Sequence, residues 1–298
     1  MNNQPTVFNW LSILFLGLIW GGTFMVVAIA LEGYPPLTVA CARTTLGALT
    51  LLLLVHLMGR PMPTGRAVWG YLVVIGTLNT ALPFALLSWG QQYVPSAFAG
   101  ISMAVLPLFV LPLAHILSDE KMTARKTGGV ILGFIGSAVL IGPTAFDFSE
   151  GSLALPQMAC IGASISYAIS SVLTRVCPPI DSIVMAALTL VVGSICLIPA
   201  MLIFEGLPVW VEGRAGYAIV FLGLIPTAFA ALLRVQTIRT AGSVFMTLVN
   251  YQVPVWSMIF GVLVLSEVLP LRFFAALAFI MCGLTISQWA SLAKLLKR

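Results

Sequence analysis

Long apolar stretches alternate with short polar ones along the whole chain. A helix that crosses the roughly 30 Å hydrocarbon layer of a bilayer needs about 20 mostly apolar residues. Ten stretches reach this length and predict ten membrane-spanning helices. Their approximate ranges are 9–31, 37–58, 67–93, 96–117, 124–142, 153–174, 182–204, 215–238, 243–265 and 271–292. The predicted fold class is therefore an all-α membrane protein.

The composition supports the same class, because 60% of the 298 residues are hydrophobic and only 8% are charged. The net charge of +5 does not indicate nucleic acid, since Lys and Arg occur at the ends of apolar stretches, where they would meet lipid headgroups. The five cysteines show no metal-type spacing. We expect membrane lipid as a partner, no nucleic acid, no cofactor and no metal.

The basic residues also predict an orientation, because Lys and Arg stay on the cytoplasmic side. Ten crossings place both termini on one face. That face would carry Arg60, Arg66, Lys121, Arg125, Lys126, Arg175, Arg239, Lys294, Lys297 and Arg298. The opposite face would carry only Arg214 and Arg272. Both termini are therefore predicted to be cytoplasmic.

The two halves of the chain resemble each other at a shift of 147 residues. The shift matches Gly59 with Gly206, Pro61 with Pro208, Gly76 with Gly223, Thr80 with Thr227, Ser96 with Ser243, Pro107 with Pro254, Glu120 with Glu267, Arg125 with Arg272, and Gly136 with Gly283. Five crossings per half is an odd number, so the second copy must enter the membrane from the opposite side. We predict two inverted five-helix repeats, residues 1–146 and 147–298, which is an arrangement typical of transporters.

Polar side chains near the middle of the predicted helices mark a candidate binding site. Unpaired polar groups cost several kcal/mol in hydrocarbon, so at this depth they bond to another helix or face a wet cavity. The expected lining residues are Trp20, Asn79, Thr80, Met103, Tyr167, Thr227, Asn250 and Gln252. A midplane site between inverted repeats is where a carried substrate is expected.

A structural role is the alternative for each of these residues. Asn250 and Gln252 could join helices through hydrogen bonds, which are typically worth about 0.6–2 kcal/mol. Since they lie two residues apart, they project about 200° apart on a helix. One of them should therefore line the cavity while the other packs, and the sequence leaves open which one.

Prolines and arginines inside the spans raise further questions. Pro107 and Pro254 lie near the middle of matched helices, where each is either a hinge or a static kink. Arg43 and Arg234 are expected to snorkel outward to water. If Arg43 turned inward instead, it would be a candidate partner for a substrate carboxylate. Glu267 is expected to interact with the start of the helix that follows it.

No Asp or Glu lies at membrane depth, which gives no support to a carboxylate proton relay. Neither histidine is placed to serve an intramembrane enzyme, and there is no phosphate-binding loop. We therefore expect a transporter rather than an enzyme, with facilitated rather than proton-coupled transport.

The stretch LIWGGTF (18–24) and the mirrored segments beginning at Pro107 and Pro254 resemble the EamA-type members of the drug/metabolite transporter superfamily, and in particular its amino acid exporters. This resemblance covers essentially the whole chain. It implies a multi-pass exporter in a bacterial-type inner membrane. It also implies a central cavity lined by the first, third, fourth, sixth, eighth and ninth helices. The second copy has Tyr167-Ala168 where the first has Trp20-Gly21, so a symmetric role for Trp20 is not supported.

The expected lining combines aromatic and apolar surface with uncharged hydrogen-bonding groups. This suits a small zwitterion, so we predict export of neutral or aromatic amino acids by alternating access, by a carrier that works as a monomer. The alternatives are a multidrug or lipophilic-cation exporter and a channel or scramblase.

Overall fold

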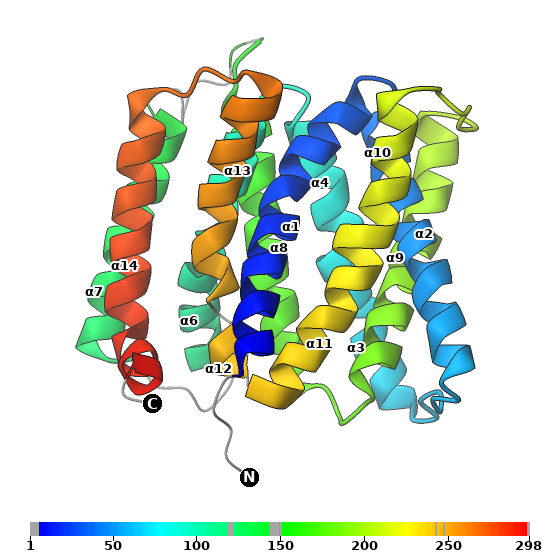
Figure 1. The fold of residues 1–298 in the computed structure, drawn as a ribbon, viewed down its shortest axis with the longest axis horizontal. Helices are drawn as coiled ribbons and strands as arrows, with labels where there is room; N and C mark the ends of the chain where they lie inside the picture. Colours follow the sequence, from blue (N-terminus) through cyan, green and yellow to red (C-terminus); the bar gives the residue numbers. More distant parts are fainter. Residues whose placement is uncertain are drawn as a thin grey trace.

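The computed structural model describes residues 6–117, 122–142, 149, 151–241, 243–246 and 248–296. Within them the chain is helical, and the helices run roughly antiparallel to one another in a single bundle (Figure 1). Nine helical segments of the described residues are long and apolar enough to cross a bilayer, and α13 adds a shorter apolar helix of 17 residues. The predicted all-α architecture is confirmed.

The first copy begins with α1 (Val7–Leu31) and α2 (Pro36–Leu57). The third span is formed by α3 (Arg66–Gly76), the π-helix η1 (Thr77–Ala81) and α4 (Leu82–Gly90). The fourth consists of α5 (Ser96–Met103) and α6 (Leu106–Leu117), and the fifth is α7 (Ala124–Ile141).

The second copy repeats this order. It comprises α8 (Ala154–Val176), α9 (Ser182–Phe204), α10 (Arg214–Leu222), the π-helix η3 (Gly223–Phe229), α11 (Ala230–Ala241), α12 (Ser243–Met246), α13 (Val249–Leu265) and α14 (Leu271–Leu296). Most boundaries lie within three residues of the predicted ones. The first helix begins at one end of the bundle and α8 begins at the other, so equivalent helices run in opposite directions (Figure 1).

Local sequence explains where several helices begin and where two of them end. Thr6 and Asn9 form a reciprocal capping box at the start of α1, and Thr123 accepts a hydrogen bond from the Lys126 backbone at the start of α7. Gly59 and Gly206, which the repeat matches, both adopt positive φ (61° and 81°) just after the second and seventh spans. A left-handed conformation after a helix favours glycine.

Packing between helices joins the two copies. The second and seventh spans pack together as α2 and α9, the fifth and tenth as α7 and α14, and the first and ninth as α1 and α13. At the crossing of α7 and α14, a Cβ on Gly129 would lie 2.5 Å from the Gly283 carbonyl oxygen, so the small residues permit close approach. The largest apolar cluster includes Leu16, Phe98 and Phe245 and extends over both copies.

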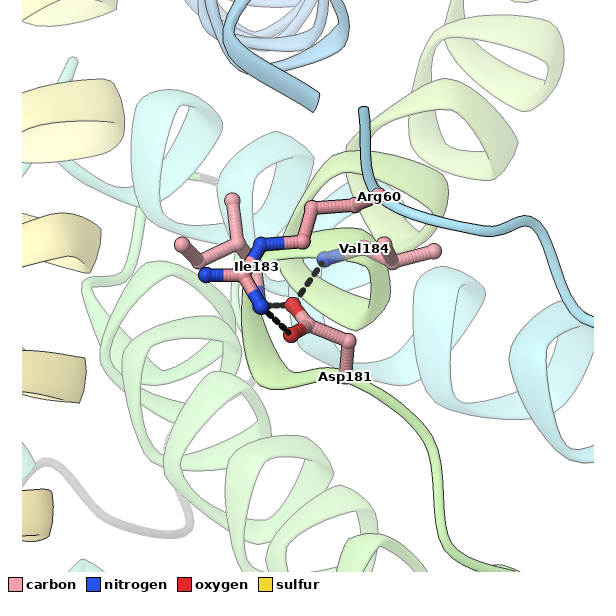
Figure 2. A network of polar contacts seen from close by, with 4 residues as sticks. All are labelled: Arg60, Asp181, Ile183 and Val184. Carbon is pink, nitrogen blue, oxygen red and sulfur yellow. Dashed lines mark hydrogen bonds and ion pairs between the residues drawn. The ribbon is translucent and has the colours of Figure 1, made fainter. Parts of the chain in front are cut away.

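Polar contacts at the ends of the bundle also connect the copies. At the end where α1 begins and α14 finishes, Arg60 pairs with Asp181 at 3.3 Å, and Asp181 also accepts hydrogen bonds from the Ile183 and Val184 backbone (Figure 2). At the other end, Arg214 forms two hydrogen bonds with Glu32, of 2.5 and 2.7 Å. Both pairs are partly exposed, so each adds little to the stability of the bundle.

Two carboxylates cap helices of the opposite copy. Glu205 accepts from the Leu37 and Thr38 backbone at the start of α2, at 2.8 and 2.7 Å. Glu267 accepts from the Ser96 and Ala97 backbone at the start of α5, at 2.6 and 3.2 Å. The prediction that Glu267 serves the helix following it is wrong, because the fold brings the start of α5 to this carboxylate. Its repeat partner Glu120 lies outside the described residues.

Candidate functional site

The third and eighth spans share an irregularity near their middle. In the third span the π-helix covers Thr77–Ala81, and in the eighth it covers Gly223–Phe229. A shift of 147 residues carries 77–81 onto 224–228, so the two π-helices occupy equivalent positions. Such local widenings of a helix occur frequently at functional sites.

Prolines account for these π-helices. Pro226 has no N–H to offer the Leu222 carbonyl four residues earlier, and its ring would collide with that carbonyl in a regular helix. The Thr227 hydroxyl instead donates to the Leu222 carbonyl at 2.8 Å. In the third span, Pro83 lies directly after the π-helix, as the second residue of α4. Neither proline was among the predicted site residues, although each stands inside an apolar run of the sequence.

Side chains of the opposite copy contact both π-helices. The indole Nε1 of Trp20 on α1 donates to the Pro226 carbonyl at 3.2 Å. On α8, Ser166 Oγ donates to the Leu78 carbonyl at 2.7 Å. Under the repeat shift Trp20 corresponds to Tyr167, the residue after Ser166. The first helix of each copy therefore bonds to the π-helix of the other.

Arg43 lies at the centre of this region. Its side chain is only 6% exposed, and its Nη2 lies 3.4 Å from Thr227 Oγ1. The guanidinium carbon is 4.0 Å from the centre of the Phe84 ring on α4, within the range of a cation–π contact. The expectation that Arg43 snorkels is wrong. It lies about 10 Å along α2 from the start of that helix, and its long side chain extends inward into the bundle.

The positive charge of Arg43 has little compensation. Its Nε is buried without a hydrogen-bond partner, and no carboxylate of the described residues lies within 4 Å of the guanidinium. Half-buried Tyr167 on α8 is near enough to interact with it electrostatically. A guanidinium presents donors in a fork that matches a carboxylate. The group of Trp20, Arg43, Phe84, Tyr167 and Thr227, here called the central cluster, can therefore bind an anionic group beside aromatic rings.

Other predicted site residues lie next to this cluster or away from it. Half-buried Asn79, in the π-helix of the third span, accepts a hydrogen bond from Ser170 Oγ at 3.0 Å. Thr80 is 2% exposed, donates to the Gly76 and Thr189 carbonyls, and packs against Gly193 on α9. Thr80 therefore joins the third span to the seventh and is not brought to Arg43.

The fourth span is interrupted where Met103 ends α5 and α6 begins at Leu106. Pro107 is the second residue of α6, so it follows a break in the span and does not kink a continuous helix. Met103 is half-buried, and its sulfur lies 3.8 Å from Ser164 Oγ on α8. In the ninth span, α12 ends at Met246 and α13 begins at Val249. Pro254 lies inside α13.

The two amides on α13 have different surroundings. Gln252 Nε2 donates to the Ile13 carbonyl on α1 at 3.3 Å, and a Cβ on Gly17 would lie 2.8 Å from the Gln252 side chain. Gln252 therefore packs in the contact between α1 and α13. Half-buried Asn250 projects about 200° away from Gln252 around the helix.

The central cluster offers one buried cation, aromatic surface and backbone carbonyls. Among the described residues, no group of three or more metal-ligating side chains occurs. Phe84, Ser166 and Ser170 also belong to this region, although none was among the predicted site residues. Phe and Ser are common inside membrane helices, so only their position relative to Arg43 and the π-helices distinguishes them.

Comparison with known proteins agrees with this fold. The chain is 25% identical over 282 residues to the uncharacterized transporter YoaV of Bacillus subtilis, covering 94% of this chain and 96% of YoaV. It is 27% identical over 253 residues to the uncharacterized inner membrane transporter YedA of Escherichia coli K12, covering 84% and 80%. It is 22% identical over 268 residues to a probable terminal-alkyne amino-acid exporter of Streptantibioticus cattleyicolor, covering 88% and 86%.

A solved crystal structure matches the fold with a TM-score of 0.67 at 19% identity, covering 96% of this chain and 98% of the other. The profile of the EamA-like transporter family matches twice, over residues 8–142 and 155–288, and so covers nearly the whole chain. The protein is therefore a multi-pass membrane transporter that belongs to the EamA-like transporter family.

Proposed function

We propose that this transporter exports neutral or aromatic amino acids across a bacterial inner membrane by alternating access. The substrate binds at the central cluster, between a first copy at residues 1–146 and a second, inverted copy at 147–298. The relative named as a probable amino-acid exporter supports this substrate class.

The observation that carries the proposal is the buried guanidinium of Arg43. A cation in hydrocarbon is costly without an anionic or strongly polar partner, and such residues mark substrate pathways in membrane proteins. Thr227 and the Phe84 ring compensate the charge only in part. A substrate carboxylate would complete the site, and the same positive charge opposes a lipophilic cation.

The neighbouring side chains fit the rest of an amino acid. Trp20, Phe84 and Tyr167 offer aromatic surface for an apolar side chain, and half-buried Met103 adds an adaptable apolar group. Asn79 and Asn250 are half-buried uncharged amides on the third and ninth spans, and we propose them as acceptors for a substrate ammonium. This combination favours a zwitterion over a simple hydrophobic anion.

Transport is proposed to be outward, with both termini in the cytoplasm. Most Lys and Arg of the loops belong to the end where the described chain begins and finishes, as the positive-inside rule requires. None of the Asp and Glu residues that the structure describes lies inside a helix, which gives no support to a carboxylate at membrane depth for proton coupling. We therefore propose facilitated transport.

Counterflow in vesicles tests the proposal. Purified protein is reconstituted and loaded with unlabelled amino acid, and uptake of labelled Phe, Trp, Met and Thr is measured. We expect saturable counterflow for at least one of them, unchanged by a protonophore. Phenethylamine and phenylalanine methyl ester, which lack the carboxylate, should compete poorly. Movement of none of the four amino acids, or preferential transport of tetraphenylphosphonium, would contradict the proposal.

A further inference from the structure

A second arginine lies further along the eighth span than Thr227. Arg234 follows Thr227 by seven residues, across the end of the π-helix and the first turn of α11. Thr227 contacts Arg43 in the central cluster. Arg234 lies about 10 Å further along the span, toward the end of the bundle where α1 begins.

The neighbours of Arg234 on α11 show that its face points into the bundle. Ala230 and Leu233 pack with the large cluster that includes α1 and α13. Ala231 and Leu232 pack with a second cluster formed mainly by α2 and α9. Arg234 projects between these two directions, so it lies where the two packed groups of helices meet rather than on the lipid-facing side.

Arg234 is nevertheless accessible. Its side chain is exposed. A side chain that pointed from α11 into fully packed helices would be inaccessible. The inward direction and the exposure together indicate that the guanidinium borders a space inside the bundle that solvent can reach. No carboxylate of the described residues lies within 4 Å of it.

We propose that Arg234 forms a second anion-binding subsite, which receives the carboxylate of a substrate before Arg43 does. Arg43 lies beside Thr227 and Arg234 about 10 Å further along the eighth span, so the two cations raise the local concentration of anions and guide them along the span. The inference rests on the proposed function for the identity of the substrate. The accessibility and the positive potential at Arg234 do not depend on that identity.

A thiol assay tests these two properties without any transport. Arg234→Cys is made in a background that lacks the five native cysteines. It is reacted in membranes with an anionic sulfonate and a cationic trimethylammonium methanethiosulfonate reagent, added from either side. We expect reaction mainly from the side of the termini, and faster with the anionic reagent. Phe229→Cys is the control, because Phe229 is 47% exposed and follows Thr227 by only two residues, on another face of the span.

Adding Arg43→Gln to this variant should lower the rate with the anionic reagent and raise the rate with the cationic reagent, each by about two- to twenty-fold, as expected for one charge about 10 Å away at effective dielectric constants between 80 and 20. An unreactive residue 234, or a rate ratio that does not depend on Arg43, would overturn the proposal.

Counterflow supplies the second readout. Arg234→Gln should raise the concentration of Phe needed for half-maximal transport from the side of the termini by about ten-fold, with a smaller effect from the other side. Arg234→Lys should restore most of the loss. An equal change from both sides would overturn the ordering of the two subsites. If the thiol assay succeeds and no amino acid is moved, the proposed substrate is wrong while the anion subsite stands.

Discussion

Arg43 is the residue whose surroundings differ most from the usual environment of its type. It is buried in a membrane helix, and its nearest polar contact is a neutral hydroxyl. If it holds the substrate carboxylate, its loss removes a charge-assisted interaction worth about 1.5–3 kcal/mol, or about 10- to 100-fold in affinity.

We therefore predict that Arg43→Gln raises the half-saturating concentration of Phe by about 10- to 100-fold in counterflow, because that interaction is lost. The half-saturating concentration of Arg43→Lys should fall between those of the wild type and Arg43→Gln, since an ammonium keeps the charge and loses the planar fork. Arg66→Gln, at the exposed start of α3, is the control and should change little. A variant at 43 with wild-type affinity would remove the basis for the carboxylate site.

The two amides of α13 allow a matched comparison at the same scale. Gln252→Leu removes the hydrogen bond to the Ile13 carbonyl, typically worth about 0.6 to 2 kcal/mol in a membrane, and should lower the melting temperature in detergent. Asn250→Leu should leave the melting temperature nearly unchanged and reduce counterflow. If Gln252→Leu abolished counterflow at full stability, the roles assigned to the two amides would be reversed.

At the scale of elements, the two π-helices are the feature shared by both copies. In each, the first helix of the opposite copy donates to a carbonyl in the widened turn. A change between π and α geometry would rotate the residues that follow in the same span relative to those that precede it. In the eighth span this includes Arg234.

Pro226→Ala tests this idea. Alanine supplies the missing N–H and removes the clash, and proline inside a helix costs about 3 kcal/mol relative to alanine. We predict equal or higher thermal stability together with reduced counterflow, because closing the π-helix rotates Arg234 relative to Arg43. Pro199→Ala, inside regular α9, is the control and should leave counterflow intact. Full counterflow activity in Pro226→Ala would show that the π geometry has no role in transport.

For the whole molecule, the inverted arrangement makes equivalent residues face opposite sides of the membrane. Met62 and Val209 are such a pair, 48% and 77% exposed in loops that follow the second and seventh spans. With the native cysteines removed, we predict that an impermeant maleimide added to intact cells labels Val209→Cys, and labels Met62→Cys only after permeabilisation. Labelling of both from the same side would contradict the inverted repeat.

The sequence by itself determined the membrane class, the spans and the family resemblance, because each depends on patterns within the chain. Apolar stretches of spanning length, and scarce Pro, Glu and Gly residues at a constant spacing, carry this information without tertiary contacts. The all-α prediction and the EamA family resemblance are confirmed. The copy boundaries at 146 and 147, the cytoplasmic termini and the substrate stay predictions.

Only the tertiary structure decided which polar residues meet. Depth alone grouped Trp20, Tyr167 and Thr227 with Thr80 and Gln252, but depth does not give direction. In the structure Thr80 and Gln252 each join two helices. Arg43 was expected to snorkel because an isolated helix offers no inward alternative. In the folded bundle, Phe84 and Thr227 provide Arg43 with contacts on the inner side of α2. The partner of Glu267 was mistaken for the same reason, since a carboxylate caps whichever helix start the fold brings within hydrogen-bonding distance.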